Sequence, residues 1–352
     1  MKKPLPPFSS TYSPNVPELL NSLNISLALS TYQAGKLIFL SAENDETLIQ
    51  LPRTFDNIMG IAVDGNKLAV ACKTETVELL NNHELAPTYP KSPNTYDGLY
   101  LPRATYYTGQ LALHDMIFSK GNILAVNTLF SCLSIINNEC SFKPIWQPKF
   151  IKELTPDDKC HLNGMATIDG KPVYVSALGK TDTRQGWRDN KMKGGVLINV
   201  DSNEIILENL PMPHSPRIYN DNLYILLSAS GELAAVDKDK GTYGTITKLG
   251  CYARGMDRYD DYLFIGVSKL RHKSSVFGDL PIAKTSFAGI IIVYLPTGNT
   301  VGHIRYETSV EEIYDVKVLP GLRRPGIVSH TQVTNKLALT SPIGDFWAGE
   351  DK

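Results

Sequence analysis

The chain has 352 residues, of which 42% are hydrophobic and 20% charged, and its formal net charge at pH 7 is −1. A nearly neutral chain of ordinary composition gives no general electrostatic reason to expect nucleic acid or an anionic membrane surface as a partner. Five scattered cysteines without a C-x-x-C pair argue against a disulfide framework or a zinc site. The first residues break into prolines instead of an apolar signal segment, and no apolar run approaches the about 18 residues that span a bilayer. We therefore expect a reduced, soluble, cytoplasmic protein.

Short strands separated by turns recur along the chain, whereas convincing long helical periodicity is absent. Residues 1–24 are expected to form an N-terminal extension, with one or two helical turns at 17–23. From residue 25 onward, short segments rich in Val, Ile, Leu and Tyr are bounded by Gly, Asp or Asn, which is typical of strands.

These strands group into repeated units. The unit that begins at 164–170 is the clearest, with further strands at 172–177 and 194–200 and a polar excursion at 178–193 between them. The first strands of the six units align at 60–65, 115–118, 164–170, 216–221, 255–260 and 315–318. A spacing of roughly 40 to 60 residues lies within the range of propeller blades.

The two ends of the repeated region complement each other. The region opens with strands at 25–31, 36–41 and 47–51 that resemble the second, third and fourth of a unit, and a lone first strand lies at 313–318. Pairing them would complete a sixth blade and leave no exposed sheet edge in the ring. We therefore predict an all-β, six-bladed β-propeller over residues 25–331, closed by the N-terminal strands, with a tail at 332–352. Seven blades is the alternative, because residues 326–329 resemble a further second strand.

A propeller gathers two kinds of position around the opening of its axial channel. Residues just before each first strand ring the channel, and residues just after each second strand form the walls above it. Three of the seven histidines occupy the first kind of position, in three successive units. The candidates are Asn57, His114, Asp115, His161, Asn163, His214, Arg217, Arg254 and Glu312 before first strands, and Tyr32, Trp187, Arg188 and Lys269 after second strands. We expect them to line one axial pocket.

The residue types at this pocket suggest roles. His161 and His214 suit a general base, and Glu312 suits an acid or an electrostatic stabiliser. Glu311 is adjacent to Glu312, and neighbouring residues of a strand point to opposite faces, so only one of the two should reach the pocket. The arginines and the lysine favour an anionic ligand, unless neighbouring carboxylates neutralise them.

A metal is the alternative use of these side chains. Asn57, Asn163 and Glu312 together could mimic the cage of metal-dependent lactonase propellers, but they come from separate units. No local spacing such as H-x-x-x-H supports a zinc site. We favour histidines hydrogen-bonded to neighbouring carboxylates and leave the cofactor open, with a divalent metal as the alternative.

The excursion at 178–193 is too polar for a core segment. Trp187, flanked by Arg184 and Arg188, suits a lid that stacks on a planar substrate. The alternative is a surface loop whose tryptophan packs on the neighbouring blade. A second excursion, beginning at Arg271, His272 and Lys273, is expected beside it. The basic run at 269–273 lacks interleaved aromatic residues, so nucleic acid is not expected.

Several phrases of the sequence resemble a bacterial family of conserved hypothetical proteins, a domain of unknown function. They are STYQAGK at 30–36, CHLNGMA at 160–166, ALGKTDT at 177–183, GWR at 186–188, GGVLI at 194–198, MPHSPR at 212–217 and EEIYDV at 311–316. The resemblance spans most of residues 25–325 and implies no established activity. In architecture the chain is also similar to six-bladed propellers of the gluconolactonase and strictosidine-synthase type, a likeness that carries no function with it.

Two functions therefore stay open. The first is a small-molecule-binding propeller, with an enzyme activity such as that of a hydrolase, lyase or cyclase, whose polar axial pocket lies under the Trp187 loop. The second is a non-catalytic propeller that binds a ligand or a partner protein on the same face. No nucleic-acid or membrane partner is expected, and the polar rim favours the small-molecule pocket.

Overall fold

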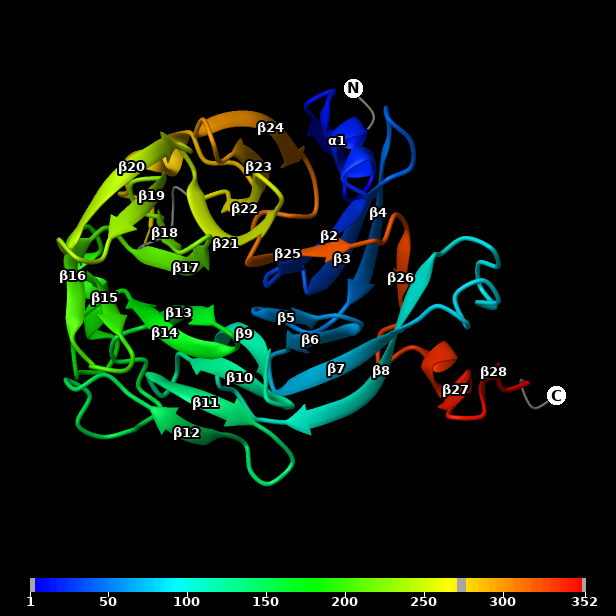
Figure 1. Cartoon of the computed structure of the whole chain (residues 1–352), viewed down its shortest axis with the longest axis horizontal. Helices are drawn as coiled ribbons and strands as arrows, with labels where there is room; N and C mark the ends of the chain where they lie inside the picture. Colours follow the sequence, from blue (N-terminus) through cyan, green and yellow to red (C-terminus); the bar gives the residue numbers. More distant parts are fainter. Residues whose placement is uncertain (1–3, 271–276, 350–352) are drawn as a thin grey trace.

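The strand-rich sequence folds into six sheets that stand around a central axis (Figure 1). The computed structural model describes residues 4–270 and 277–349. Each sheet has four principal antiparallel strands, so the predicted six-bladed β-propeller is confirmed.

Both ends of the repeated region build the blade that closes the ring. Its order is β25 (Asp315–Pro320), β2 (Ile25–Thr31), β3 (Lys36–Ala42) and β4 (Leu48–Thr54). β25 pairs antiparallel with β2 from Ser30 opposite Asp315 to Ile25 opposite Pro320. Ring closure by the N-terminal strands is thus confirmed.

The other five blades follow one another along the chain, with the first strand innermost. Their strands are β5 (Ile61–Asp64), β6 (Lys67–Ala71), β7 (Glu75–Asn82) and β8 (Gly98–Tyr107); β9 (Leu113–Ser119), β10 (Asn122–Asn127), β11 (Cys132–Ile136) and β12 (Lys143–Trp146); β13 (Leu162–Ile168), β14 (Lys171–Ala177), β15 (Gly195–Asn199) and β16 (Ile205–Leu210); β17 (Pro213–Tyr219), β18 (Asn222–Leu227), β19 (Glu232–Asp237) and β20 (Thr242–Lys248); and β21 (Tyr252–Tyr259), β22 (Tyr262–Ser268), β23 (Gly289–Tyr294) and β24 (Asn299–Tyr306).

Four first strands begin two or three residues earlier than the sequence pattern indicates. In β9, β17 and β21 the pairing with the second strand is interrupted by an irregularity of register and then resumes, for example at Leu113 opposite Asn127 and at Pro213 opposite Leu227. A bulge of this kind breaks the alternation by which a strand is recognised in a sequence. As a result, His114 and His214 lie inside strands.

Some elements lie outside the six four-stranded blades. β26 (Pro325–Ile327) pairs in parallel with β8 at the outer edge of its blade. This is the segment that suggested a seventh blade, and it adds an edge strand instead. In the region 1–24, β1 (Ser10–Tyr12) extends the last blade at β24, and α1 (Val16–Ser22) packs its fully buried Val16 and Leu20 into the core.

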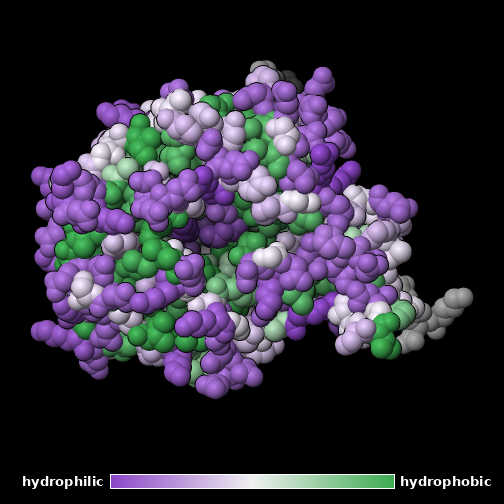
Figure 2. All heavy atoms as spheres, viewed as in Figure 1, coloured by the Kyte–Doolittle hydropathy of each residue, from purple (hydrophilic) through white to green (hydrophobic). Residues whose placement is uncertain are grey.

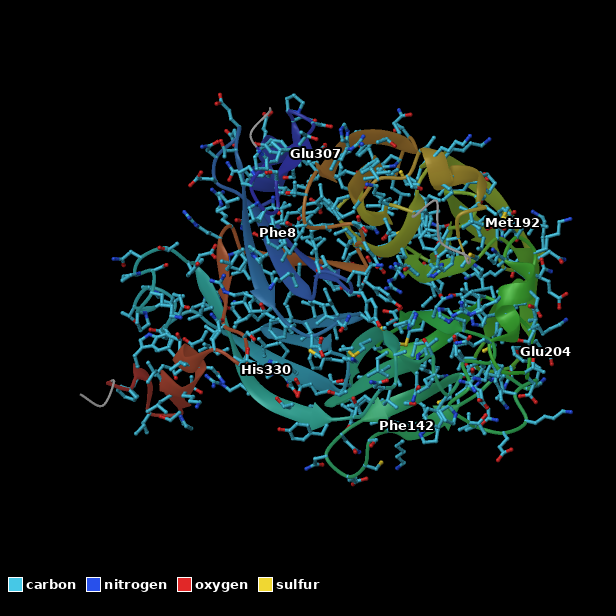
Figure 3. All side chains as sticks on the ribbon, turned by 180° about the vertical axis from the view of Figure 1, so that it is seen from behind. Phe8, Phe142, Met192, Glu204, Glu307 and His330 are labelled. Carbon is cyan, nitrogen blue, oxygen red and sulfur yellow. The ribbon has the colours of Figure 1, made fainter. Side chains whose placement is uncertain are left out.

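The tail contains the 3₁₀ helix η3 (Val333–Leu337) and a hairpin of β27 (Ala338–Ser341) and β28 (Gly344–Trp347) beside β8. Nε2 of His330, just before the tail, lies 2.8 Å from Oε1 of Glu75. Seen from behind, His330 lies on the opposite side of the ring from Met192 in the 178–193 excursion (Figure 3).

The core consists of apolar layers between neighbouring blades. Leu124 and Val126 of β10, for instance, pack with Met165 and Val175 of the next blade. At the axis the first strands approach more closely still: a Cβ on Gly255, which has φ +72°, would stand 2.6 Å from the Cα of Asp315. Only glycine fits there, and the tight approach brings side chains from distant parts of the chain to one centre.

The face seen in Figure 2 is largely hydrophilic and is hollowed near the axis. None of the helices in the described part of the chain has the length and apolar character that crossing a bilayer requires.

Candidate functional site

A cavity of about 780 Å³ opens on the axis, where first strands begin and second strands end. Nine of the thirteen residues expected at the site line it: Tyr32, His114, His161, Trp187, Arg188, His214, Arg254, Lys269 and Glu312. The other four, Asn57, Asp115, Asn163 and Arg217, lie outside the lining.

Two of those four, Asp115 and Arg217, form a bidentate ion pair between blades. Arg217 donates from Nη1 to Oδ2 of Asp115 at 2.7 Å and from Nη2 to Oδ1 at 3.1 Å, and also to the carbonyl of Met165 at 2.8 Å. Burial opposes the charge on Arg217, but the carboxylate of Asp115 outweighs it, so the pKa of the guanidinium is raised. Asp315 and Lys317 lie close by as a second pair, 3.4 Å apart. We call these four residues the buried ion cluster.

The two asparagines are also engaged within the protein. Asn163 donates from Nδ2 to the carbonyl of Pro213 at 2.9 Å and accepts from the hydroxyl of Ser176 at 2.8 Å. Asn57 donates to the carbonyl of Tyr32 at 3.1 Å. These contacts join neighbouring segments at the axis, and neither asparagine lines the cavity.

The backbone at the start of β9 fixes the orientation of the His114 ring. Two residues earlier, Ala112 has the left-handed φ of 54°, which turns its carbonyl towards the ring. Nδ1 of His114 donates to this carbonyl at 2.8 Å, and the hydroxyl of Thr128 lies 2.8 Å from the same nitrogen. That hydroxyl donates to the carbonyl of Leu162 in the next blade.

The same arrangement is repeated at His214. Met212 has φ 50°, and its carbonyl accepts from Nδ1 of His214 at 2.9 Å. Ser228, fourteen residues after His214 as Thr128 is after His114, lies 2.8 Å from Nδ1 and donates to the carbonyl of Ala253. Burial lowers the pKa of His214 to about 3 and lowers that of His114 well below its usual value, so both rings are neutral near pH 7.

His161 has a carboxylate behind it. Nδ1 of His161 lies 2.8 Å from Oδ1 of Asp158, and the other oxygen of Asp158 accepts from the indole nitrogen of Trp187 at 3.0 Å. The two rings face each other, with centroids 4.4 Å apart. Asp158 and His161 both have φ near 50° (49° and 50°), a conformation that costs energy in residues other than glycine and often marks functional sites.

Trp187 is carried by the 3₁₀ helix η1 (Gly186–Asn190) and is only 3% exposed. It packs in an apolar cluster with Met212 and Tyr252 of neighbouring blades while lining the cavity. η2 (Pro281–Lys284) contributes Ile282 to the same cluster. The second excursion was expected from Arg271 to Lys284: its first residues, 271–276, lie outside the described residues, and its remainder packs in the same cluster as Trp187.

The charges on the cavity wall are unequal. Arg254 pairs with Glu312 and stacks on Tyr314, with its guanidinium carbon 4.0 Å from the ring centroid. Arg188, stacked on Trp187, and Lys269 are exposed. Three cationic side chains thus face one carboxylate, which leaves two positive charges in excess. Of the adjacent glutamates, Glu312 is the one that lines the cavity.

Several residues of the candidate site are not among those predicted from the sequence. Asp158 has a sequence signal, since an aspartate three residues before a histidine can orient it. Tyr252 and Tyr314 stand at first-strand positions, but an aromatic residue there is equally typical of the core. Among the described residues, no group of three or more histidine, cysteine, aspartate or glutamate side chains is arranged to hold a metal ion.

The fold and the cavity define the class of protein: a six-bladed β-propeller with a cavity on its axis. Residues 14–328 match the family model described as a domain of unknown function (DUF4915), and the chain belongs to that family. The resemblance of the sequence phrases to such a family is thereby confirmed. No curated protein matches the chain.

Two solved structures show the same fold. A chain in the crystal structure of a nidogen/laminin complex is 11% identical, with a TM-score of 0.55 over 84% of this chain and 99% of that chain. A protein of unknown function from Bacteroides caccae is 7% identical, with a TM-score of 0.52 over 84% of this chain and 98% of that one. At such identities the similarity concerns the fold alone and gives no support to a gluconolactonase-type activity.

Proposed function

We propose that the axial cavity binds a small anionic molecule and that His161 acts on it as a general base. The observation that carries the proposal is the excess of two positive charges on the cavity wall, in a chain whose formal net charge is −1. A concave site with charge of one sign raises the local concentration of oppositely charged ligands.

Aromatic side chains supply the apolar part of the site. Trp187, Tyr252, Phe277 and Tyr314 line the cavity together with the charged residues. A volume of about 780 Å³ suits a small molecule rather than a protein segment. The ligand would place its charged end against Arg188 and Lys269 and its less polar part against the rings.

The proposed catalytic role depends on the contacts of His161. A carboxylate hydrogen-bonded to Nδ1 fixes the orientation of an imidazole and stabilises its protonated form, which favours proton removal by the other nitrogen. Because Asp158 also accepts a hydrogen bond from Trp187, the tryptophan loop would act as a lid that is linked to His161 through Asp158. Proton removal of this kind suits a hydrolase, lyase or cyclase.

Binding of anions can be tested without knowing the natural ligand. Thermal shift and calorimetric titrations with small carboxylates and phosphates, each matched to a neutral amide or alcohol, should show stabilisation by the anions alone. The double variant Arg188→Ala/Lys269→Ala should bind them about tenfold more weakly. Lys143→Ala/Lys248→Ala, which removes two exposed lysines from the outer strands β12 and β20, should bind like the wild type. Equal stabilisation by the neutral compounds, or an unchanged affinity of the cavity variant, would refute the proposal.

Catalysis is a separate step of the test. An anion that binds should be turned over by the wild type, and His161→Gln should retain binding while losing about 10²- to 10⁴-fold in rate. Tight binding without turnover would favour the non-catalytic propeller.

A further inference from the structure

We infer that the ligand is an anion that also carries several hydroxyl groups, because His114, His161 and His214 present only hydrogen-bond acceptors to the cavity. The inference rests on the proposed binding of an anion and adds to it the chemical class. It follows from where the proton sits on each ring.

Nδ1 carries the proton at His114. A hydroxyl has one hydrogen to donate, and that of Thr128 goes to the carbonyl of Leu162, which can only accept. Thr128 therefore has none left for His114 and accepts from it. The carbonyl of Ala112 also only accepts, so both partners of Nδ1 require a hydrogen on that nitrogen.

The same reasoning applies to His214 and His161. At His214 the hydrogen of Ser228 is donated to Ala253, and the carbonyl of Met212 accepts from Nδ1. At His161 the partner of Nδ1 is the carboxylate of Asp158, which has no hydrogen to give when ionised. Three different contacts thus impose the same tautomer.

The other ring nitrogen is then a free acceptor. In a neutral imidazole with its proton on Nδ1, Nε2 carries a lone pair. Nε2 of these three histidines makes no hydrogen bond to any described residue. None of the three atoms is among the buried polar atoms that lack a partner, so each is accessible to solvent. Since all three rings line the cavity, the cavity wall offers three hydrogen-bond acceptors that have no donor within the described protein.

The ligand must supply those donors without a positive charge of its own, because the wall already carries two positive charges in excess. Ammonium groups are therefore disfavoured, and neutral hydroxyl groups remain as compact donors. Several hydroxyls on a short carbon chain also present C–H groups that pack on aromatic rings such as Tyr252 and Trp187. A carboxylate or a phosphate would supply the negative charge.

The tautomers can be measured directly. Two-dimensional ¹H–¹⁵N correlation of histidine-labelled protein, assigned with single histidine variants, should show that the neutral ring carries its proton on Nδ1 and a lone pair on Nε2 at all three residues. A neutral ring with its proton on Nε2 at His114, His161 or His214 would overturn the inference, whatever the protein binds.

Binding of matched five-carbon compounds tests the ligand class. Ribonate should bind at least about tenfold more tightly than pentanoate, which has the same carboxylate and no hydroxyl groups. Ribitol, the neutral match, should bind more weakly than ribonate, and ribitol 5-phosphate distinguishes a phosphate from a carboxylate.

If pentanoate binds as well as ribonate, the inference fails while the proposed anion binding stands. If ribitol binds as well as ribonate, the proposed function itself fails. Absence of binding by both hydroxylated anions, or coordination of Zn²⁺ by the three histidines, also overturns the inference.

A variant connects the two measurements. His161→Phe keeps an aromatic ring and removes the acceptor, so the preference for ribonate over pentanoate should fall about three- to tenfold. His83→Phe, at an exposed histidine outside the cavity, should leave the preference unchanged.

Discussion

The inner strands β9 and β17 supply residues both to the wall of the axial cavity and to the buried ion cluster, yet the two groups differ in how many of their hydrogen bonds are made within the protein. His114 and Asp115 are neighbours on β9, but Asp115 accepts from Arg217 and from the backbone of Met165, whereas Nε2 of His114 has no partner among the described residues. Polar groups at one axis therefore serve two purposes. Polar side chains that have hydrogen-bond partners in other blades hold the ring together. Polar atoms without such partners are available to a ligand.

Arg217→Ala should have the largest effect on stability. It leaves the carboxylate of Asp115, whose side chain is only 5% exposed, without its cation, so the free energy of unfolding should fall by about 3–5 kcal/mol. Urea denaturation followed by circular dichroism measures the change. Arg188→Ala, on the exposed rim, should change the same quantity by less than about 0.5 kcal/mol. Similar losses in the two variants would mean that the ion cluster has no special structural role.

The next effect concerns pH and the neutral histidines. The pKa of His214 is about 3 in the folded protein, below the value of about 6.5 expected when unfolded, so the unfolded state takes up the proton first. The stability that the neutral ring confers is present above pH 6.5 and is lost as the pH falls towards 3. Between pH 6.5 and 5 the loss should be about 2 kcal/mol at most for this residue.

His214→Asn should reduce that dependence on pH, measured as the difference in the free energy of unfolding between pH 6.5 and pH 5. His83→Asn, which alters an exposed histidine, should leave the difference as in the wild type. An unaltered slope in His214→Asn would show that this ring takes up protons equally in the folded and the unfolded states.

Asp158→Asn should have the smallest effect on stability, about 1 kcal/mol, because one hydrogen bond is weakened and the packing is kept. The amide cannot accept from both His161 and Trp187, so the contact with Trp187 loosens. With Trp146 and Trp347 replaced by phenylalanine, the emission of Trp187 should shift to longer wavelength. Asp189→Asn, exposed in the same loop, is the control. An unshifted emission would mean that the environment of Trp187 does not depend on Asp158, which contradicts a lid held by the residue that orients His161.

The fold could be predicted because each blade repeats a simple local pattern. β2 has the bounds 25–31 that the sequence indicated, since all of its residues are buried and a clear turn follows it. The starts of β9 and β17 could not be predicted, because pairing beyond a bulge depends on contacts with the second strand. A repeat reveals where strands recur but not where their pairing is interrupted.

The site was predictable in position but not in detail. Propeller geometry placed nine expected residues on the cavity wall, since first and second strands meet at one face. It did not reveal that Asn163 and Arg217 would be satisfied by Pro213 and Asp115, because partners from other blades are not apparent in a single sequence. The contact of Asp158 with His161 is local and could have been predicted, but its contact with Trp187, 29 residues later in the chain, could not.

Closure of the ring by β25 has a consequence for synthesis of the protein. Glu312 and Tyr314, which line the cavity, immediately precede this strand, while its partner β2 lies before the other five blades in the chain. During synthesis the cavity is therefore complete only after all five of those blades and β25 have followed β2. A ligand that needs the whole cavity can recognise only chains in which β25 has joined β2, and its binding would stabilise that closed ring.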